Sequence, residues 1–392
     1  MRDSIAAAVI AALVAITASA PHVRADDGST DAPEDAAARA AAKKAKKEAK
    51  DAKEAAERKA GDTLEVHGRV FTRATATKEE TALGPGEWTN EFSLASARIG
   101  VDYQWREKVR AQVEYETTRD SLRDAFIELA LGHGLRLRAG RIKLPIGAIE
   151  QTSTWTLPTI DRGMVADVLA DGLGMTGRSS ALELRWRDEG PWRPTVTVTV
   201  AQGLRTTGGE QPGAIEDGGA LTVAARAEVS PCLAQIAVVG ASRVVNYGSA
   251  AARFWNAGLE VEVDLEPIAR GLRLWGDVHY GTSHLGAAVV ADADRPFAAA
   301  ELVAGYRFGG LDKNARYVEP FVGAGWFNPI ADRKGDDTTE VVVGVAGGLW
   351  KRWRAQAQFG YQNAKSLRPA GLLGTADVND RQRVTLQLGT AF

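Results

Sequence analysis

The sequence of 392 residues is short of features that would point to several familiar classes of protein. A single cysteine, Cys232, excludes an internal disulfide. Lysine and arginine (48 residues) nearly balance aspartate and glutamate (50 residues), so the charge gives no argument for nucleic-acid binding. After Ile16 no stretch approaches 18 consecutive apolar residues, so we do not expect membrane-spanning helices.

Motifs that would indicate an enzyme are also scarce. Residues 172–177 read GLGMTG and fit a dinucleotide-binding pattern, but no strand precedes them and no helix follows, so we interpret them as a flexible loop tip. His279 and His284 lie five residues apart across a strand end, where we expect two isolated rim histidines rather than a metal pair. The sequence contains no GxSxG or HExxH motif. We therefore predict no catalytic residue, no cofactor and no metal.

The first residues have the pattern of a secretory signal. Arg2 supplies a positive charge, and residues 5–16 form an unbroken apolar run of the length of a signal-peptide core. Candidate cleavage sites end at Ala20 and Ala25, and Pro21 disfavours the first. We predict a signal peptide over residues 1–25. The alternative, an uncleaved anchor, is disfavoured because the run is short and rich in alanine.

Residues 26–61 have a different composition, rich in Ala, Lys and Glu, which are strong helix formers. Alanines recur at alternating steps of four and three residues from Ala38 to Ala56, which is a heptad pattern. We predict a short periplasmic helix here. It either forms a coiled coil that helps the protein trimerise or remains a solvated tail, and its lysine-rich face suits contact with anionic cell-wall polymer.

Residues 62–392 show alternating apolar and polar residues in segments of about ten, separated by Gly, Pro, Asp and Asn. In the last segment, one face of an extended strand carries Val384, Leu386, Leu388, Thr390 and Phe392, while the other carries Arg383, Thr385, Gln387, Gly389 and Ala391. An apolar strand with a C-terminal aromatic is typical of outer-membrane barrels. Tyr and Trp at many strand ends indicate membrane interfaces.

The alternation predicts sixteen strands, an even number as in bacterial outer-membrane barrels. Their predicted ranges are 64–75, 92–105, 109–117, 122–131, 135–142, 181–187, 195–202, 221–229, 233–245, 256–265, 272–280, 298–308, 317–327, 340–350, 353–362 and 383–392. We predict an all-β protein, a 16-stranded antiparallel transmembrane β-barrel preceded by the short helix. Closure should pair the last strand with the first, which removes exposed edges.

Residues 144–180 break the rhythm. They show no clean alternation, yet they are too apolar for a disordered loop, since they include Trp155, Leu157, Met164 and Val165. Folding into the barrel would bury these side chains. We therefore predict that this segment folds inward and narrows the lumen.

A family resemblance appears around this segment. The sequence Asp124-Ala125-Phe126-Ile127-Glu128, then Gly140, Lys143 and Pro145, and then Asp161-Arg162 resembles the phosphate-selective porin (O/P-type) family of bacterial outer membranes. The strand that begins at Phe92 resembles an early strand of that family. The resemblance implies a trimeric 16-stranded channel with an inward loop, located in the outer membrane of a Gram-negative bacterium. Its partners would be membrane lipid and small hydrophilic or anionic solutes.

We predict that the following residues line the pore or its constriction: Arg98, Arg136, Arg138, Lys143, Asp161 and Arg162. Arg136 and Arg138 share a strand face opposite Leu135 and Leu137, so the arginines should face the lumen. The predicted function is passive diffusion of small solutes, with a preference for anions or phosphate. The alternatives are a structural tether to the cell wall and, third, an outer-membrane enzyme.

Overall fold

The computed structural model describes the barrel of this chain and leaves its N-terminal segment aside. Described are residues 61–81, 84–202, 221–231, 234–247, 250–264, 271–283, 295–309, 315–331, 337–349, 352–364 and 378–392. Three predictions fall outside these residues: the signal peptide, the N-terminal helix with its coiled-coil and tether hypotheses, and the rim position of His284. Within the described residues, no helix combines the length and the apolar character needed to cross a membrane.

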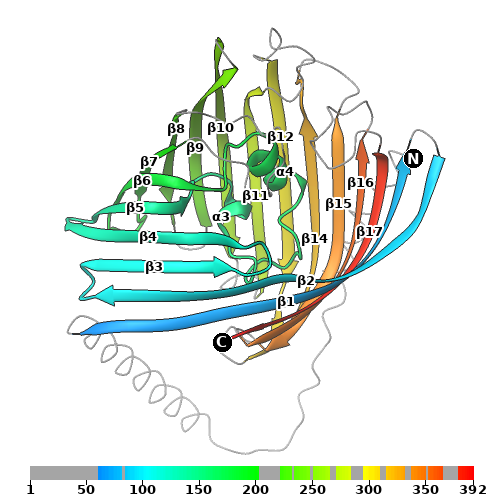
Figure 1. Cartoon of the computed structure of the whole chain (residues 1–392), viewed down its shortest axis with the longest axis horizontal. Helices are drawn as coiled ribbons and strands as arrows, with labels where there is room; N and C mark the ends of the chain where they lie inside the picture. The colour runs from blue at the N-terminus through cyan, green and yellow to red at the C-terminus, as the bar shows by residue number, and fades with distance from the viewer. Residues whose placement is uncertain are drawn as a thin grey trace, which may run out of the picture. The chain divides into compact units, whose positions relative to one another are not determined.

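The described chain forms one antiparallel sheet (Figure 1). Its strands are β1 (Asp62–Thr81), β2 (Gly84–Trp105), β3 (Val109–Glu116), β4 (Ser121–Gly132), β5 (Leu135–Lys143), β6 (Arg178–Arg187), β7 (Thr195–Gln202), β8 (Leu221–Val229), β9 (Ala234–Tyr247), β10 (Ala250–Asp264), β11 (Leu272–Ser283), β12 (Arg295–Tyr306), β13 (Phe308–Gly309), β14 (Arg316–Asn328), β15 (Thr338–Leu349), β16 (Trp353–Ala364) and β17 (Val378–Ala391). Only Arg307 separates β12 from β13, and both pair with β14, so they form one interrupted strand. The predicted sixteen strands are confirmed.

The sheet closes on itself between its first and last strands. β17 pairs with β1 from Arg69↔Ala391 to Thr81↔Val378, as predicted. The closure continues past the last strand residue, because Phe392 N donates to Gly68 O (3.1 Å) and Gly68 N donates to Phe392 O (3.2 Å). Closure gives every strand a partner on both sides over part of its length, which a membrane protein needs where water cannot satisfy the backbone.

Gly68 provides a test of this closure. A β-carbon at Gly68 would overlap the Phe392 ring and lie 2.8 Å from the carbonyl oxygen of Arg98. We expect Gly68→Val to destabilise the barrel by roughly 1–3 kcal/mol, because an overpacked site forces the backbone to shift. The measurement is the fraction of protein that keeps the compact, heat-sensitive gel mobility of a closed barrel. Gly240→Val is the control, since the nearest atom to a β-carbon there is 3.6 Å away; equal loss in both variants would contradict the account.

The two faces of the wall differ in the sense that the alternation predicts. In β17 the outward Leu388 is 57% exposed, while the inward Thr385 is 1% exposed. The same division holds around the barrel, where apolar side chains such as Ile127, Val238 and Leu302 are more than half exposed. Lipid outside and polar side chains inside account for this pattern.

Candidate functional site

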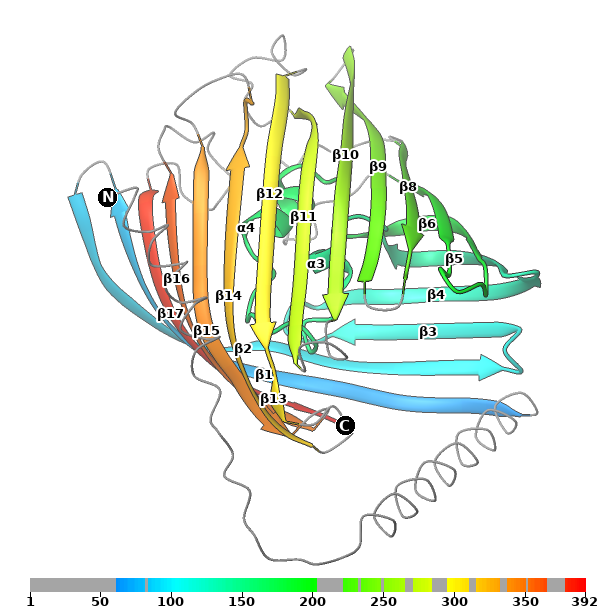
Figure 2. The ribbon, with the colours of Figure 1, turned by 180° about the vertical axis from the view of Figure 1, so that it is seen from behind.

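The segment between β5 and β6, residues 144–177, lies inside the barrel (Figures 1 and 2). It contains two helices of one turn each, α3 (Ala148–Gln151) and α4 (Met164–Asp167), followed by η1 (Val168–Gly172). We call these residues the inward loop. Its position confirms the prediction that this stretch folds into the barrel.

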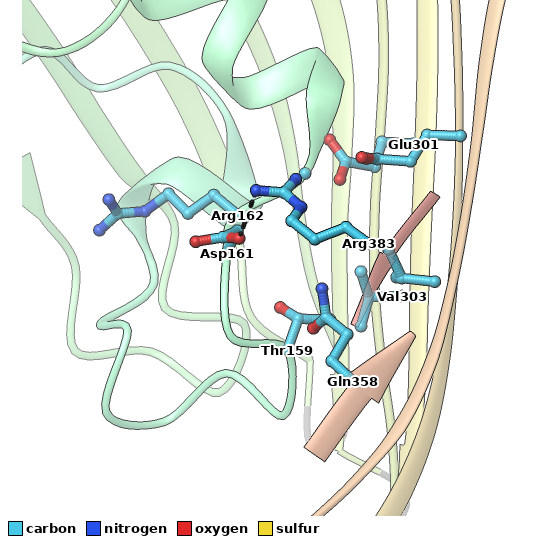
Figure 3. Close-up of a pocket in the computed structure, with 10 residues that line it drawn as sticks. Thr159, Asp161, Arg162, Glu301, Val303, Gln358 and Arg383 are labelled. Atoms are coloured by element: carbon cyan, nitrogen blue, oxygen red, sulfur yellow. Dashed lines mark ion pairs between the residues drawn. The ribbon is translucent and has the colours of Figure 1, made fainter. Parts of the chain in front are cut away.

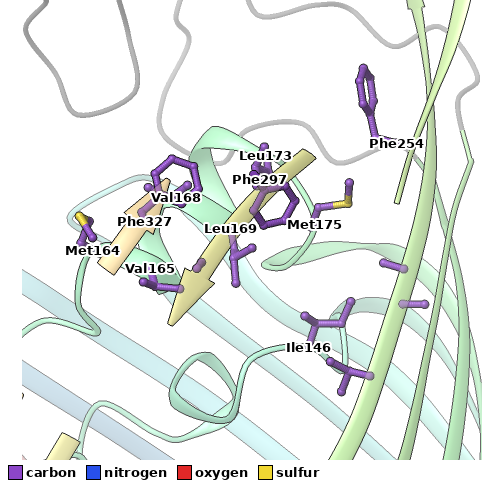
Figure 4. Close-up of a cluster of buried hydrophobic side chains, with 14 of the residues drawn as sticks. Ile146, Met164, Val165, Val168, Leu169, Leu173, Met175, Phe254, Phe297 and Phe327 are labelled. Carbon is purple, nitrogen blue, oxygen red and sulfur yellow. The ribbon is translucent and has the colours of Figure 1, made fainter. Parts of the chain in front are cut away.

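Apolar side chains hold one face of the inward loop against the wall (Figure 4). From the loop, the buried cluster includes Ile146, Met164, Val165, Val168, Leu169, Leu173 and Met175, and from the wall Phe254, Phe297 and Phe327. Each fully buried side chain of this size contributes about 1.5–3 kcal/mol. The motif at residues 172–177 is part of this contact, since Leu173 and Met175 are buried. Our interpretation of it as a flexible loop tip was therefore wrong: the packing of its apolar residues fixes it.

Carboxylates of the wall accept hydrogen bonds from the backbone of the inward loop. Glu260 accepts from Gly147 N (2.5 Å) and Asp277 from Ala148 N (2.9 Å) at the start of α3. At the start of α4, Glu340 accepts from Met164 N (2.8 Å) and Glu301 from Ala166 N (3.3 Å). The first N–H groups of a helix have no partner within it, so these acids satisfy them. The acids are thereby covered by the loop.

Arg354 of β16 binds the opposite kind of group in the loop. Its guanidinium donates to the carbonyl oxygens of Thr154 (3.2 Å), Trp155 (2.9 Å), Pro158 (3.0 Å) and Leu157. These four bonds cover a stretch without regular structure, where backbone carbonyls would otherwise be buried without donors.

The middle of the loop is fixed at the seam of the barrel by Asp161. Its carboxylate lies 3.0 Å from Arg73 of β1 and 3.4 Å from Arg383 of β17. The space between the loop and the wall here is only about 10 Å³, about the size of one water. Arg162 turns away from this space, whereas Arg383 points toward Asp161 (Figure 3). Solute therefore has no room to pass behind the loop at this point.

The other face of the loop carries Glu150 between two cations. The carboxylate of Glu150 lies 3.4 Å from Lys143 Nζ and 3.1 Å from Arg162 Nε. Burial alone would raise the pKa of Glu150, but Lys143 and Arg162 hold it below its usual value. The group is therefore an anion that the two cations neutralise.

Arginines dominate the wall that follows the seam, from β1 to β6. Arg98 contacts Glu114 (3.1 Å) and Glu116, and Arg178 contacts Asp124 (3.0 Å). Among the described residues, the buried Nε atoms of Arg123 and Arg141 have no hydrogen-bond partner.

On β4, β5 and β6 of this wall, guanidinium groups cover buried carboxylates. Glu128 contacts Arg136 (2.7 Å), Arg138 (2.5 Å) and Arg185 (3.2 Å). The side chain of Arg136 is 49% exposed and that of Arg185 31%, whereas that of Glu128 is 4% exposed. The lumen therefore meets the cations, and the acid lies beneath them.

The comparisons with known proteins fit this geometry. Residues 84–261 match the model of a family described as phosphate-selective porin O and P. Over these residues the chain is similar to that family. A comparison with curated protein sequences found no match.

Solved porins share the fold at low sequence identity. An anion-selective porin from Comamonas acidovorans matches with a TM-score of 0.61 and 12% identity, over 84% of this chain and 100% of that one. The outer-membrane channel DcaP of Acinetobacter baumannii matches with a TM-score of 0.56 and 14% identity, over 85% and 98% of the two chains. A trimer form of OmpT from Vibrio cholerae matches with a TM-score of 0.51 and 13% identity, over 85% and 100%. At these identities the matches establish the porin fold.

The structure brings the predicted site residues of this porin together in two groups. Lys143 and Arg162 meet at Glu150, and Arg136 and Arg138 meet at Glu128. Arg98 is buried beside acids of β3. Asp161 lies apart from both groups and binds Arg73 and Arg383 at the seam of the barrel. Sequence reasoning did not single out Arg110, Arg123, Arg141, Arg178 and Arg185. Arg185 was within reach of the sequence argument, because Arg185 alternates with the outward Leu184 in β6.

Several other arginines on the inner face bind the inward loop or share an acid of the wall, and Arg243 and Arg307 among them are buried. Arg243 donates to Leu173 O (3.1 Å), and Arg273 and Arg307 share Glu319. Among the described residues, no group of three or more His, Cys, Asp and Glu is arranged to hold a metal ion. The barrel thus has a basic wall from β1 to β6 and a wall from β10 to β16 whose acids are covered.

Proposed function

We propose that this chain is an outer-membrane porin for passive diffusion of small hydrophilic solutes, with a preference for anions. The observation that carries the proposal is the layering of charges at Glu128. The exposed guanidinium groups of Arg136 and Arg185 lie toward the lumen and cover the buried carboxylate. A solute in the lumen experiences the nearer charges more strongly. A wall that presents one sign of charge selects ions of the opposite sign.

The inward loop would form the constriction. Its apolar face and the space of about 10 Å³ near Asp161 leave no route behind it, so solutes would pass between the loop and the β1–β5 wall. We assign Arg98, Lys143 and Arg162 to this narrow part, with Asp161 as the group that anchors the loop. Arg136 and Arg138 would form a second basic zone along the lumen. Partial charge balance by Glu114 and Glu150 favours a weak preference rather than tight anion binding.

We also propose that the porin is a homotrimer. The support is the family match together with the similarity to a porin solved in a trimer form. Closed rings of identical subunits are common among homo-oligomers.

Liposome swelling tests the diffusion function. Vesicles that contain the purified full chain should swell in small neutral and anionic solutes, at rates that fall as solute size increases. Protein-free vesicles and vesicles with heat-denatured protein are the controls. If swelling matches these controls for every solute, the diffusion function is wrong.

A further inference from the structure

His67 of β1 is a titratable side chain on the inner face of the barrel. The neighbouring Val66 is 59% exposed and points to the outside, so the alternation of the strand places His67 inside. The next inward residue is Arg69, whose guanidinium donates to Ser153 Oγ of the inward loop (3.2 Å). His67 therefore lies beside the narrow part of the lumen, at the position that follows the contact between β1 and the loop.

A glycine lets the imidazole of His67 reach across the neighbouring strand. The register puts His67 opposite Gly100 of β2, and Gly100 opposite Glu114 of β3. A β-carbon at Gly100 would lie 2.5 Å from the Nε2 atom of the ring, so the ring occupies the space that a side chain would need. The same nitrogen lies 3.8 Å from the carboxylate of Glu114. His67, Gly100 and Glu114 thus form one row across three strands.

The charges around this row already include more than one cation for Glu114. Arg98 and Arg69 lie 3.1 Å and 3.9 Å from its carboxylate. A proton on His67 therefore adds positive charge to the wall, because the nearest acid already has partners. The charged groups on the inner face around His67 are Glu65 and Arg69 of β1, Arg98 and Asp102 of β2, and Arg110, Glu114 and Glu116 of β3, and the inward loop adds the paired Arg162 and Glu150.

His67 is the most exposed side chain of this charged row. Its side chain is 39% exposed, whereas Arg69 is 16%, Glu114 11% and Arg98 6% exposed. Histidine is the side chain whose charge ordinarily changes between about pH 5 and pH 8, and arginine stays charged over that range. The group that changes charge is therefore the one that a solute in the lumen approaches most closely.

We propose that His67 is a selectivity-determining residue whose charge makes the anion preference of this channel depend on pH. Protonation of the imidazole adds a positive charge beside the narrow part and strengthens the preference, and loss of the proton weakens it. A wall with more charge of one sign selects more strongly for the opposite sign. The proposal rests on the proposed function, since it names a residue that sets the selectivity of the same diffusion path.

The test is the reversal potential of the full chain in a neutral bilayer with a KCl gradient, at about pH 8 and about pH 5.5. The chloride-to-potassium permeability ratio of the wild type should be about two- to threefold higher at the lower pH, as expected of one partly screened charge. His67→Gln should have the wild-type pH 8 ratio at both values. His67→Arg, which is always charged, should have the higher ratio at both, and it tests the proposal if the glutamine variant does not fold.

His133→Asn is the matched control. His133 is exposed in the turn between β4 and β5 and has φ 51°, a conformation that asparagine tolerates, so this variant should keep the wild-type response to pH. A wild type with the same ratio at both pH values would overturn the proposal, and so would a response of wild-type size in His67→Gln or His67→Arg. Channels that conduct in those cases leave the diffusion function intact, whereas a wild type without channels contradicts that function itself.

Discussion

Replacing Arg136 and Arg185 together by glutamine should lower the chloride-to-potassium permeability ratio about three- to tenfold. Each charge at about 8 Å in water contributes roughly 0.5 kcal/mol, with opposite sign for anion and cation, and salt screening reduces this value. Removing two exposed cations also leaves Glu128 closer to balance with its remaining partner, Arg138. The measurement is the reversal potential of the double variant in a KCl gradient.

The choice of these two arginines follows from their exposure. Combining Arg136 with Arg138 and Arg162, as the sequence alone suggests, would also remove the less exposed Arg138 and a partner of the buried Glu150 in the inward loop. A changed permeability ratio in that triple variant could then come either from lost lumenal charge or from a disturbed fold. Arg253→Gln is the control, because Arg253 lies beside the buried, inward Phe254 and therefore faces outward. An unchanged ratio in the double variant, with conductance intact, would remove these arginines from the account of selectivity.

Arg354→Ala should release the inward loop from the wall. The guanidinium donates to four loop carbonyls, and hydrogen bonds from a charged donor contribute about 1.5–3 kcal/mol each. Without them the stretch from Thr154 to Pro158 loses its donors, and the passage beside the loop should become wider and variable. We expect higher mean single-channel conductance with more current noise, while β17 still pairs with β1.

Two variants make this result specific. Arg354→Lys keeps the charge but not the planar fork of donors, so it should give an intermediate phenotype. Arg316→Ala removes an exposed arginine at the start of β14 and should conduct like the wild type. Wild-type conductance and noise in Arg354→Ala would mean that the apolar cluster alone holds the loop.

Strand periodicity was sufficient to predict the wall of this porin and the direction of its side chains. Val384 and Leu386 alternate with Thr385 and Gln387, and a period of two leaves only one assignment of faces once the outside is apolar. The same reasoning correctly placed Arg136 and Arg138 on the inner face. Hairpin register then brings both near Glu128, only eight and ten residues away.

Strand periodicity could not predict which acids of the wall the inward loop covers. Glu260 and Asp277 have the inward parity of lumenal acids, and the sequence suggests that they balance the arginines. Asp277 instead accepts from backbone N–H groups of a loop more than one hundred residues earlier in the chain, and Glu260 binds that loop at Gly147 N as well as pairing with Arg226. Which acids remain exposed depends on where that irregular loop packs, and no local pattern encodes its packing. The excess of exposed positive charge is thus a tertiary property.

The reversal potential of the wild-type protein tests the central claim most directly. The full chain is inserted into a planar bilayer of neutral lipid, with a tenfold KCl gradient across it. A lumen with exposed arginines over buried acids should give a reversal potential with the sign of chloride selectivity, and it should shrink as the salt concentration rises, because salt screens the arginines. A potential with the sign of potassium selectivity, from channels of the same protein, would contradict the account.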